Sequence, residues 1–373
     1  MDICASNNQL AVDVLREIGG SNVGQNIVFA PLSIVTALSM VYLGARGNTA
    51  AQMSKVLHFS DDKEVHSNYK NLMRELAGNG NDYIMMNVNK LFGGNTFQFH
   101  PTFVNDTENL YDARLEKLDF LNNPEASRKC INDWITQQTR GKIQQLLPDK
   151  SISESTVLVL ANILYFAANW TKPFNQMKTY KAPFTKMSNE QVMVDMMHMT
   201  SYFNVKYITD PGIKVLELPY GASQNFTMVI IVPDNNSVFK QVEQEISLKK
   251  LNKWMSNSEM KMMNVLVHLP KIKIEKSFSM KNILSSLGML DAFSQTKANF
   301  SGMTEQRDIF MSEVYHKTFL EINEKGTEAA SSTASVMSVR SFPGEEVKGD
   351  RPFYYFIKHK SKCIVLCGIV YEP

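Results

Sequence analysis

Helix-like patterns crowd into the first third of this chain, whereas most of the remainder carries strand-like patterns. Helical spacing of apolar residues or capping signals predict helices over 10–18, 31–43, 48 or 49 to 57, and 64–76. Runs rich in β-branched and aromatic residues, bounded by Gly, Pro or Asn, predict strands at 83–92, 157–166, 226–232, 263–274 and 363–370. Because helices and strands do not alternate, we expect an α+β fold with large mixed or antiparallel sheets.

Size and charge exclude several classes of protein. The chain has 373 residues, of which 44% are hydrophobic, so it can bury a large core and is not disordered. No internal repeat or low-complexity linker interrupts it, which favours a single domain over residues 1–373. Its 39 Lys and Arg against 37 Asp and Glu give no electrostatic reason to expect a nucleic-acid or membrane partner. The most apolar run, 157–168, is too short for a bilayer, which requires about twenty residues.

The N-terminus and the cysteines indicate the compartment. The first residues contain no basic region followed by an apolar run and a cleavage site, so we expect a cytoplasmic protein, although signal-less proteins can also leave cells by unconventional routes. Cys4, Cys130, Cys363 and Cys367 show neither a disulfide framework nor zinc spacing, which predicts reduced thiols. We expect no metal and no cofactor.

Catalytic motifs are missing from the sequence. It has no Gly-x-Ser-x-Gly elbow, no His-Glu-x-x-His pair and no Gly-rich phosphate-binding loop, and none of its seven histidines lies within four residues of another. We therefore expect that the protein is not an enzyme. Lys70 and Arg74 share one face of the 64–76 helix and could bind a polyanion such as a glycosaminoglycan, but two cations flanked by Glu64 and Glu75 are more often part of a solvated face.

The segment 326–349 is small and polar, lacks a helix period and is too long for an ordinary connection. Its start belongs to a series of motifs that run in order along the whole chain and end with Asp350-Arg-Pro-Phe353. These are Asn26-Ile-Val-Phe-Ala-Pro-Leu-Ser-Ile34, Leu43-Gly-Ala-Arg-Gly-Asn-Thr49, Ile131-Asn-Asp-Trp-Ile135, Thr139-Arg-Gly-Lys-Ile143, Leu160-Ala-Asn-Ile-Leu-Tyr-Phe166, Leu216-Glu-Leu-Pro-Tyr220, His268-Leu-Pro-Lys271, Leu287-Gly-Met-Leu-Asp-Ala-Phe293, Ala298-Asn-Phe-Ser-Gly302 and Glu324-Lys-Gly-Thr-Glu-Ala-Ala330. Together they resemble the serpins, and among these the ovalbumin-like, intracellular clade B group.

The resemblance implies a serpin fold with about eight or nine helices, an exposed reactive-centre loop at about 326–349, and a monomer that inhibits serine proteases. The loop is offered as a substrate and cleaved with formation of a covalent acyl-enzyme. It then inserts as an extra strand into the main sheet and drags the protease across the molecule.

The resemblance also assigns the hinge at which insertion starts. Its residues are Glu324, Gly326, Thr327, Glu328, Ala329 and Ala330. Side chains of an inserting strand alternate between two faces, and no residue from Ala329 to Ser335 is larger than Thr. A flexible Ser/Ala linker would explain the small residues but not the Gly-Thr-Glu-Ala-Ala pattern.

The same pattern places the reactive bond fourteen positions after Gly326, at Arg340-Ser341. Arg340 suits the acid-floored pocket of trypsin-like serine proteases, where a guanidinium pairs with a carboxylate. Cleavage after Met337 or Phe342 would instead suit chymotrypsin- or elastase-like enzymes. The strand from Thr327 to Arg340 would span roughly 46 Å at about 3.3 Å per residue.

Further residues correspond to those that control the opening of the sheet. Ser33, Asn162 and His316 match the buried polar cluster beneath its centre, the shutter, and Trp170 matches the aromatic residue where the hinge enters, the breach. Ala30 stands where the family usually has a serine, so the cluster lacks one hydroxyl.

A serpin-fold protein that has lost inhibition and acts as a carrier, storage protein or chaperone is the alternative. Thr327 and the pair Ala329-Ala330 argue against it, because a non-inhibitory member is expected to carry a bulky or charged residue at the first inserting position.

Overall fold

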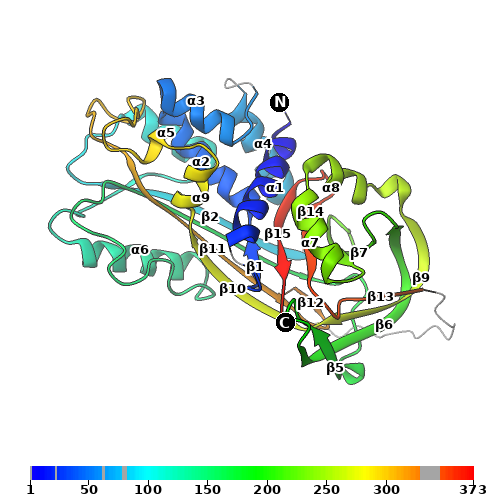
Figure 1. Ribbon diagram of the computed structural model, residues 1–373. Coiled ribbons are helices and arrows are strands. Elements are labelled where there is room, and N and C mark those ends of the chain that lie inside the picture. Colours follow the sequence, from blue (N-terminus) through cyan, green and yellow to red (C-terminus); the bar gives the residue numbers. More distant parts are fainter. Residues whose placement is uncertain (1, 22, 61–63, 78–81, 328–344) are drawn as a thin grey trace.

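The computed structural model describes residues 2–21, 23–60, 64–77, 82–327 and 345–373 (Figure 1). These described residues form nine α-helices and two large sheets, which confirms the α+β prediction and the expected number of helices.

The main sheet has six strands in the order β10-β11-β12-β4-β2-β3. Their bounds are Ile272–Ser279 (β10), Met311–Ile322 (β11), Gly326–Thr327 (β12), Leu158–Asn169 (β4), Tyr83–Gly94 (β2) and Glu116–Leu118 (β3). Strands β4 and β11 are parallel and pair directly from Met311↔Leu158 to Phe319↔Tyr165. We call this stretch of direct pairing the seam. Above the seam the two-residue strand β12 lies between them and is antiparallel to both.

The second sheet has nine strands, in the order β1-β15-β14-β8-β7-β6-β9-β13, with β5 paired to β6. Their bounds are Ile27–Phe29 (β1), Ile364–Val370 (β15), Phe353–His359 (β14), Phe226–Pro233 (β8), Ile213–Tyr220 (β7), Gln191–Ile208 (β6), Lys261–Pro270 (β9), Glu345–Lys348 (β13) and Tyr180–Thr185 (β5). The central strands β8, β14 and β15 are buried almost throughout, so both faces of this sheet are covered.

The helices are α1 (Ile3–Ser21), α2 (Pro31–Gly44), α3 (Gly47–Val56), α4 (Val65–Ala77), α5 (Pro101–Tyr111), α6 (Pro124–Gln138), α7 (Asn236–Glu245), α8 (Leu248–Trp254) and α9 (Met280–Ser286). The apolar positions Leu10, Val14 and Ile18 that predicted α1 are all buried. Pro31 starts α2, where a missing N–H costs nothing, and thirteen of its fourteen residues are buried.

Two boundary predictions were wrong. The 263–274 run is not one strand: Lys271 separates β9 of the second sheet from β10 of the main sheet. Periodicity could not show this, because apolar β-type residues continue on both sides of the turn. Helix α3 begins at Gly47 behind Arg46 and not behind Asn48 or Thr49, since their side chains bond instead to Asp291 and to the backbone N–H of Asn299.

The two faces of the main sheet carry separate apolar clusters. Even-numbered residues of β4 such as Leu160 and Leu164 join the large core with α1 and α2, while odd-numbered ones such as Val159 and Ile163 pack beneath α6. Figure 1 shows α6 apart from the other helices, across the strands of this sheet. A strand added between β4 and β11 would therefore meet the main core on one face and the α6 layer on the other.

Within the part of the chain that the structure describes, no helix has both the length and the apolarity needed to cross a membrane.

Candidate functional site

The hinge has already begun to enter the main sheet. Thr327 pairs with Ala168 of β4 and with Ile322 of β11, and it is completely buried between them. Ile322 and Ala168 lie three positions beyond the end of the direct pairing, so the two strands separate there to admit β12. The start of the predicted insertion path is therefore open.

Only glycine fits at position 326, because the backbone of β4 lies too close to leave room for a side chain. A Cβ at this position would lie 2.1 Å from the carbonyl oxygen of Ala168 and 2.7 Å from Cα of Asn169. Both are backbone atoms of β4 and cannot move aside cheaply. Glycine lets the hinge lie directly against the strand.

Thr327 is held from inside the molecule by two aromatic residues. The hydroxyls of Tyr220 and Thr327 are 2.6 Å apart, and the Tyr220 ring stacks on Trp170 with centroids 4.4 Å apart. Indole Nε1–H of Trp170 donates to the Asn323 carbonyl at 3.0 Å. Burial raises the pKa of Tyr220, so it keeps its proton and can bond to a neutral side chain. Trp170, the predicted breach residue, thus contacts the chain just before the hinge directly and Thr327 only through Tyr220.

Glu324 anchors the chain just before the hinge. Its carboxylate accepts a hydrogen bond from Thr179 Oγ1 at 2.7 Å and lies 3.3 Å from Nζ of Lys271, at the corner between β9 and β10. Burial opposes ionisation of this carboxyl, but the hydrogen bonds and Lys271 outweigh it and lower its pKa. An ionised Glu324 therefore fixes the point from which the loop departs.

The predicted shutter residues meet beneath the seam. His316 Nε2 accepts hydrogen bonds from the Ala30 N–H at 3.0 Å and the Thr318 hydroxyl at 2.7 Å, so Nδ1 carries the proton and donates to Oδ1 of Asn162. The amide of Asn162 donates in turn to the Ser33 carbonyl at 2.7 Å. Complete burial lowers the pKa of His316 to about 3, which keeps it neutral.

Sequence reasoning missed part of this cluster. Asn89 accepts a hydrogen bond from Asn162, while Asn87 accepts from Ser33 Oγ at 2.7 Å and donates to Tyr69 at 3.2 Å. Both asparagines belong to β2, two residues apart, on the face that Asn162 also occupies. Two amides at strand spacing inside an apolar run are the signal that could have revealed them.

Ala30, which stands where the family usually has a serine, leaves α2 without a side-chain cap. Its backbone N–H nevertheless bonds to His316. The missing hydroxyl therefore weakens the helix start but not the link to the histidine.

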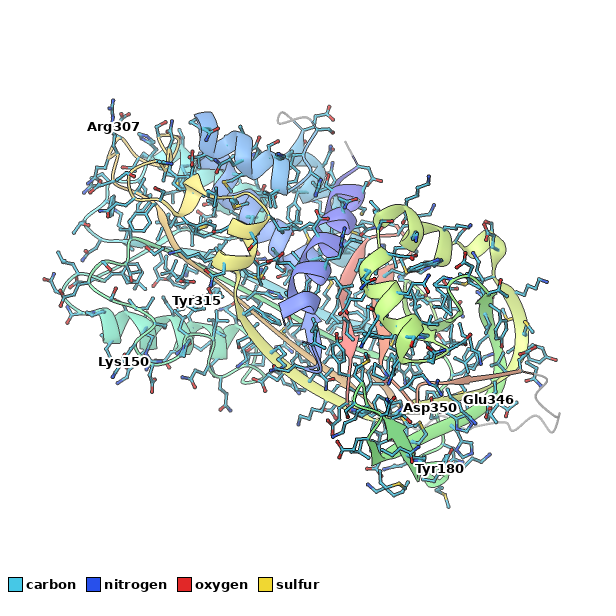
Figure 2. The ribbon with its side chains drawn as sticks, in the orientation of Figure 1. Lys150, Tyr180, Arg307, Tyr315, Glu346 and Asp350 are labelled. Carbon is cyan, nitrogen blue, oxygen red and sulfur yellow. The ribbon has the colours of Figure 1, made fainter. Side chains whose placement is uncertain are left out.

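The connection after α6 crosses the seam on the outer face. Nζ of Lys317, on β11, donates to the Gln145 carbonyl at 2.6 Å, and the Tyr315 hydroxyl donates to the Ser151 carbonyl at 3.4 Å. Figure 2 labels Tyr315 on the side of the molecule where α6 lies. Because this connection leads directly into β4, it spans both strands that must separate.

The C-terminal end of the predicted loop forms a strand. Residues Glu345 to Lys348 make up β13, which pairs in parallel with β9, and Glu346 lies 3.0 Å from His268 (Figure 2). The described ends of the 326–349 segment are thus both attached to strands. The remaining predicted residues, Glu328, Ala329, Ala330, Arg340 and Ser341, lie outside the described residues.

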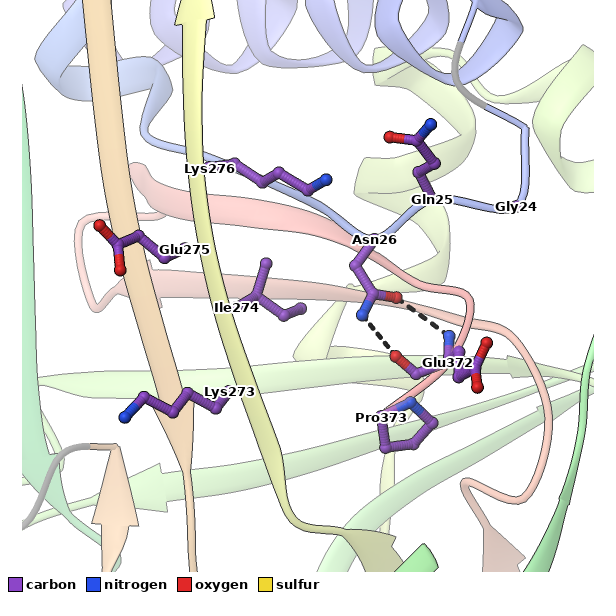
Figure 3. A pocket seen from close by; sticks show the side chains of 9 residues that line it. All are labelled: Gly24, Gln25, Asn26, Lys273, Ile274, Glu275, Lys276, Glu372 and Pro373. Carbon is purple, nitrogen blue, oxygen red and sulfur yellow. Dashed lines mark hydrogen bonds between the residues drawn. The ribbon is translucent and has the colours of Figure 1, made fainter. Parts of the chain in front are cut away.

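Other features of the described residues do not suggest a cofactor site. No group of three or more His, Cys, Asp or Glu residues lies close enough there to hold a metal ion. A surface hollow of about 490 Å³ lies between Asn26, β10 and the C-terminal residues, and Asn26 bonds to the backbone of Glu372 (Figure 3).

The two-residue strand β12, which lies between the parallel strands β4 and β11, is the described start of the 326–349 segment. A comparison with models of known protein families identifies the family of this chain. The family model described as "Serpin (serine protease inhibitor)" matches residues 5–373, so the chain belongs to the serpin family. It is therefore a member of a family of protease inhibitors and not of an enzyme family.

Individual relatives and solved structures support this family assignment. The chain is 39% identical to the leukocyte elastase inhibitor of Sus scrofa, covering 100% of this chain and 99% of that protein. It is 37% identical to Serpin B8 of Homo sapiens, with complete coverage of both. The crystal structure of uncleaved ovalbumin matches with a TM-score of 0.93 at 29% identity over both full chains, and that of maspin with 0.90 at 28% over 100% of this chain and 98% of that one. The ovalbumin-like, clade B assignment is thereby confirmed.

Because folded His316 titrates near pH 3 and an unfolded histidine near 6.5, the unfolded state binds more protons between these values. We expect stability to fall as the pH drops from about 6.5 towards 3, by up to about 1.4 kcal/mol per pH unit from this residue. Denaturant midpoints measured across this range should depend less steeply on pH in His316→Gln than in the wild type. The comparison removes the contributions of His268 and His359, which both proteins share. Equal slopes would contradict the assignment.

Thr327→Arg should convert the protein into a substrate, because a buried guanidinium without a carboxylate partner cannot be accommodated between β4 and β11. Thr327→Val is the matched control: it keeps the shape, loses only the hydroxyl bond to Tyr220 and should still insert. Each variant is mixed with a susceptible protease and run on a denaturing gel. A covalent complex with the Arg variant at wild-type yield would refute the expected insertion path.

Proposed function

We propose that this protein, acting as a single domain over residues 1–373 and as a monomer, is a suicide inhibitor of serine proteases cleaved at Arg340-Ser341. The observation that carries the proposal is Thr327, paired on both sides between β4 and β11. In the reaction, the protease serine oxygen attacks the Arg340 carbonyl and the bond to Ser341 breaks. The new amine of Ser341 takes up a proton, and an ester joins Arg340 to the protease.

The hinge register supports a specific inserted state. Continued antiparallel pairing from Thr327 would place Thr333 opposite Asn162 of β4 and His316 of β11. These two residues are direct partners across the closed seam. The Thr333 hydroxyl would accept from His316 Nδ1–H and donate to Asn162 Oδ1, and so replace the hydrogen bond that insertion breaks. Small side chains from Ala329 to Ser335 would meet no steric barrier.

The same register brings Met337 opposite Leu158, where β4 begins. Arg340 would then lie just beyond the end of the strand that accepts the loop. A protease esterified to Arg340 would travel roughly the length of residues 328–340, which is about 43 Å at 3.3 Å per residue. We infer that this movement distorts its active site before the ester is hydrolysed.

Specificity follows from the residue that enters the primary pocket of the protease. We propose Arg340 and trypsin-like targets, because a guanidinium fork requires a buried carboxylate in that pocket. Relatives named leukocyte elastase inhibitor favour a second candidate, an elastase- or chymotrypsin-like target attacked through Met337 or Phe342. One loop can present both bonds.

A protease panel distinguishes the two specificities. Trypsin, pancreatic elastase and chymotrypsin are each titrated with the wild type and with Arg340→Ala, and covalent complexes and inhibition rates are measured. We expect a complex with trypsin that Arg340→Ala reduces at least a hundredfold in rate, while complexes with the other proteases persist if Met337 or Phe342 is used. Cleavage by every protease without a complex would instead support a non-inhibitory binding or chaperone protein.

The predicted replacement hydrogen bonds can be tested at Thr333. Thr333→Val keeps the volume but leaves Asn162 and His316 unpaired in the inserted state, which costs about 1–3 kcal/mol for each buried polar group. We expect slower insertion, seen as more cleaved inhibitor per complex, and a smaller gain in thermal stability on loop cleavage. Ser332→Ala, on the opposite face, is the control. Identical behaviour of both variants would exclude this register.

A further inference from the structure

The second turn of α1 is hydrogen-bonded to the chain between β14 and β15 and to the start of β15. The side-chain amide of Asn7 donates to the Ile364 carbonyl at 2.8 Å, and Asn8 both donates to the Lys362 carbonyl at 2.8 Å and accepts from the Ile364 N–H at 2.9 Å. Three hydrogen bonds thus fix residues near the two ends of the chain against each other.

Two thiols lie beside these hydrogen bonds. Cys4, in the first turn of α1, forms a side-chain hydrogen bond with Cys363, and the two residues are 7% and 0% exposed. Asn7 Nδ2 donates to Cys363 Sγ at 3.6 Å, and Ser361 Oγ lies 4.0 Å from Cys4 Sγ. All four cysteines are free thiols in the structure, and the fold brings Cys4 and Cys363, which are 359 positions apart in the sequence, next to each other.

Their contacts shift the pKa values of the two thiols in opposite directions. The hydrogen bond from Cys363 is the main cause that lowers the pKa of Cys4; Ser361 adds to it, while burial and the carboxylates of Asp2 and Glu75 oppose it. The pKa of Cys363 is raised by the same hydrogen bond and by burial. Cys4 is therefore the nucleophile of the pair, and it lies at the helix end, nearer to solvent.

We propose that Cys4 and Cys363 form a reversible disulfide when the protein meets a peroxide. The Cys4 thiolate attacks one peroxide oxygen and breaks the O–O bond, which gives a sulfenic acid and hydroxide. The Cys363 sulfur then attacks the sulfenic sulfur, the S–O bond breaks, and water leaves. In total two thiols and one hydrogen peroxide give one disulfide and two waters, the thiols supplying the two electrons.

The other two cysteines provide internal comparisons. Cys367 is buried within β15, and its pKa is raised by burial. Cys130, on α6, is exposed, but its pKa is also raised. Neither is expected to react as the first thiol.

A disulfide here would join α1 to the second sheet and close almost the whole chain into a loop. Such a bond removes many conformations from the unfolded chain, so the oxidised protein should unfold at a higher temperature. The seam and the hinge lie in other strands, so the rate of protease inhibition should not change.

The experiment uses the full chain, treated with hydrogen peroxide and then alkylated without reduction. Tryptic digestion should yield the N-terminal peptide linked to the peptide 363–373, and dithiothreitol should release it. Because that peptide also contains Cys367, the digest is repeated with Cys363→Ser and Cys367→Ser. We expect the first variant to lose the cross-link and the second to keep it.

Thermal unfolding gives a second readout. Oxidised wild type should unfold several degrees above the reduced protein, and Cys4→Ser, a change near the helix end, should show no such difference. If Cys363→Ser does not fold, Cys4→Ser alone decides the result. The proposal fails if peroxide leaves Cys4 and Cys363 open to alkylation while Cys130 is oxidised, or if the cross-link joins other cysteines. Neither readout involves a protease, so these outcomes are independent of the inhibitory function.

Discussion

The hydrogen bond from His316 to Asn162 closes the seam between β4 and β11 at its centre. It joins two side chains that are completely enclosed, where an unpaired donor or acceptor would be costly. The ring can take part only while it is neutral, since its other nitrogen accepts from Ala30 and Thr318. The rest of the main sheet depends on this bond, because the seam cannot widen without breaking it and cannot remain open without replacing it.

The geometry of the seam explains why an inserted strand can be the more stable arrangement. Strands β4 and β11 run parallel, and parallel pairing is slightly weaker per residue than antiparallel pairing. The two residues of β12 are antiparallel to both neighbours. Extending β12 would replace one parallel ladder by two antiparallel ladders. This replacement would lower the free energy of the main sheet. What opposes it is the shutter cluster and the α6 connection held by Lys317.

Much of the framework could be predicted from local patterns. The periodicity of α1, the apolar run of α2 and the β-type run of β4 identified elements that the structure contains. Local sequence patterns did not predict the features that depend on tertiary contacts. The chain turns at Lys271 inside an unbroken β-type run, and the Cys4–Cys363 contact joins residues that only the fold brings together. Asn87 and Asn89 lay within a predicted strand, but their role required knowing which strand lies beside β4.

Both described ends of the loop are held by one continuous stretch of chain. Strand β9 pairs with β13 at the far end, and Lys271, one residue after β9, binds Glu324 at the near end. The backbone from β9 to Lys271 thus carries both attachment points of the loop. In the proposed inserted state, an intact loop inserted as far as position 337 would have only the eight Cα–Cα steps from 337 to 345 to return to β13, a reach of at most about 29 Å against roughly 33 Å of inserted strand. In the proposed mechanism, cleavage detaches the loop at one end, after which it could insert along the full length of the main sheet.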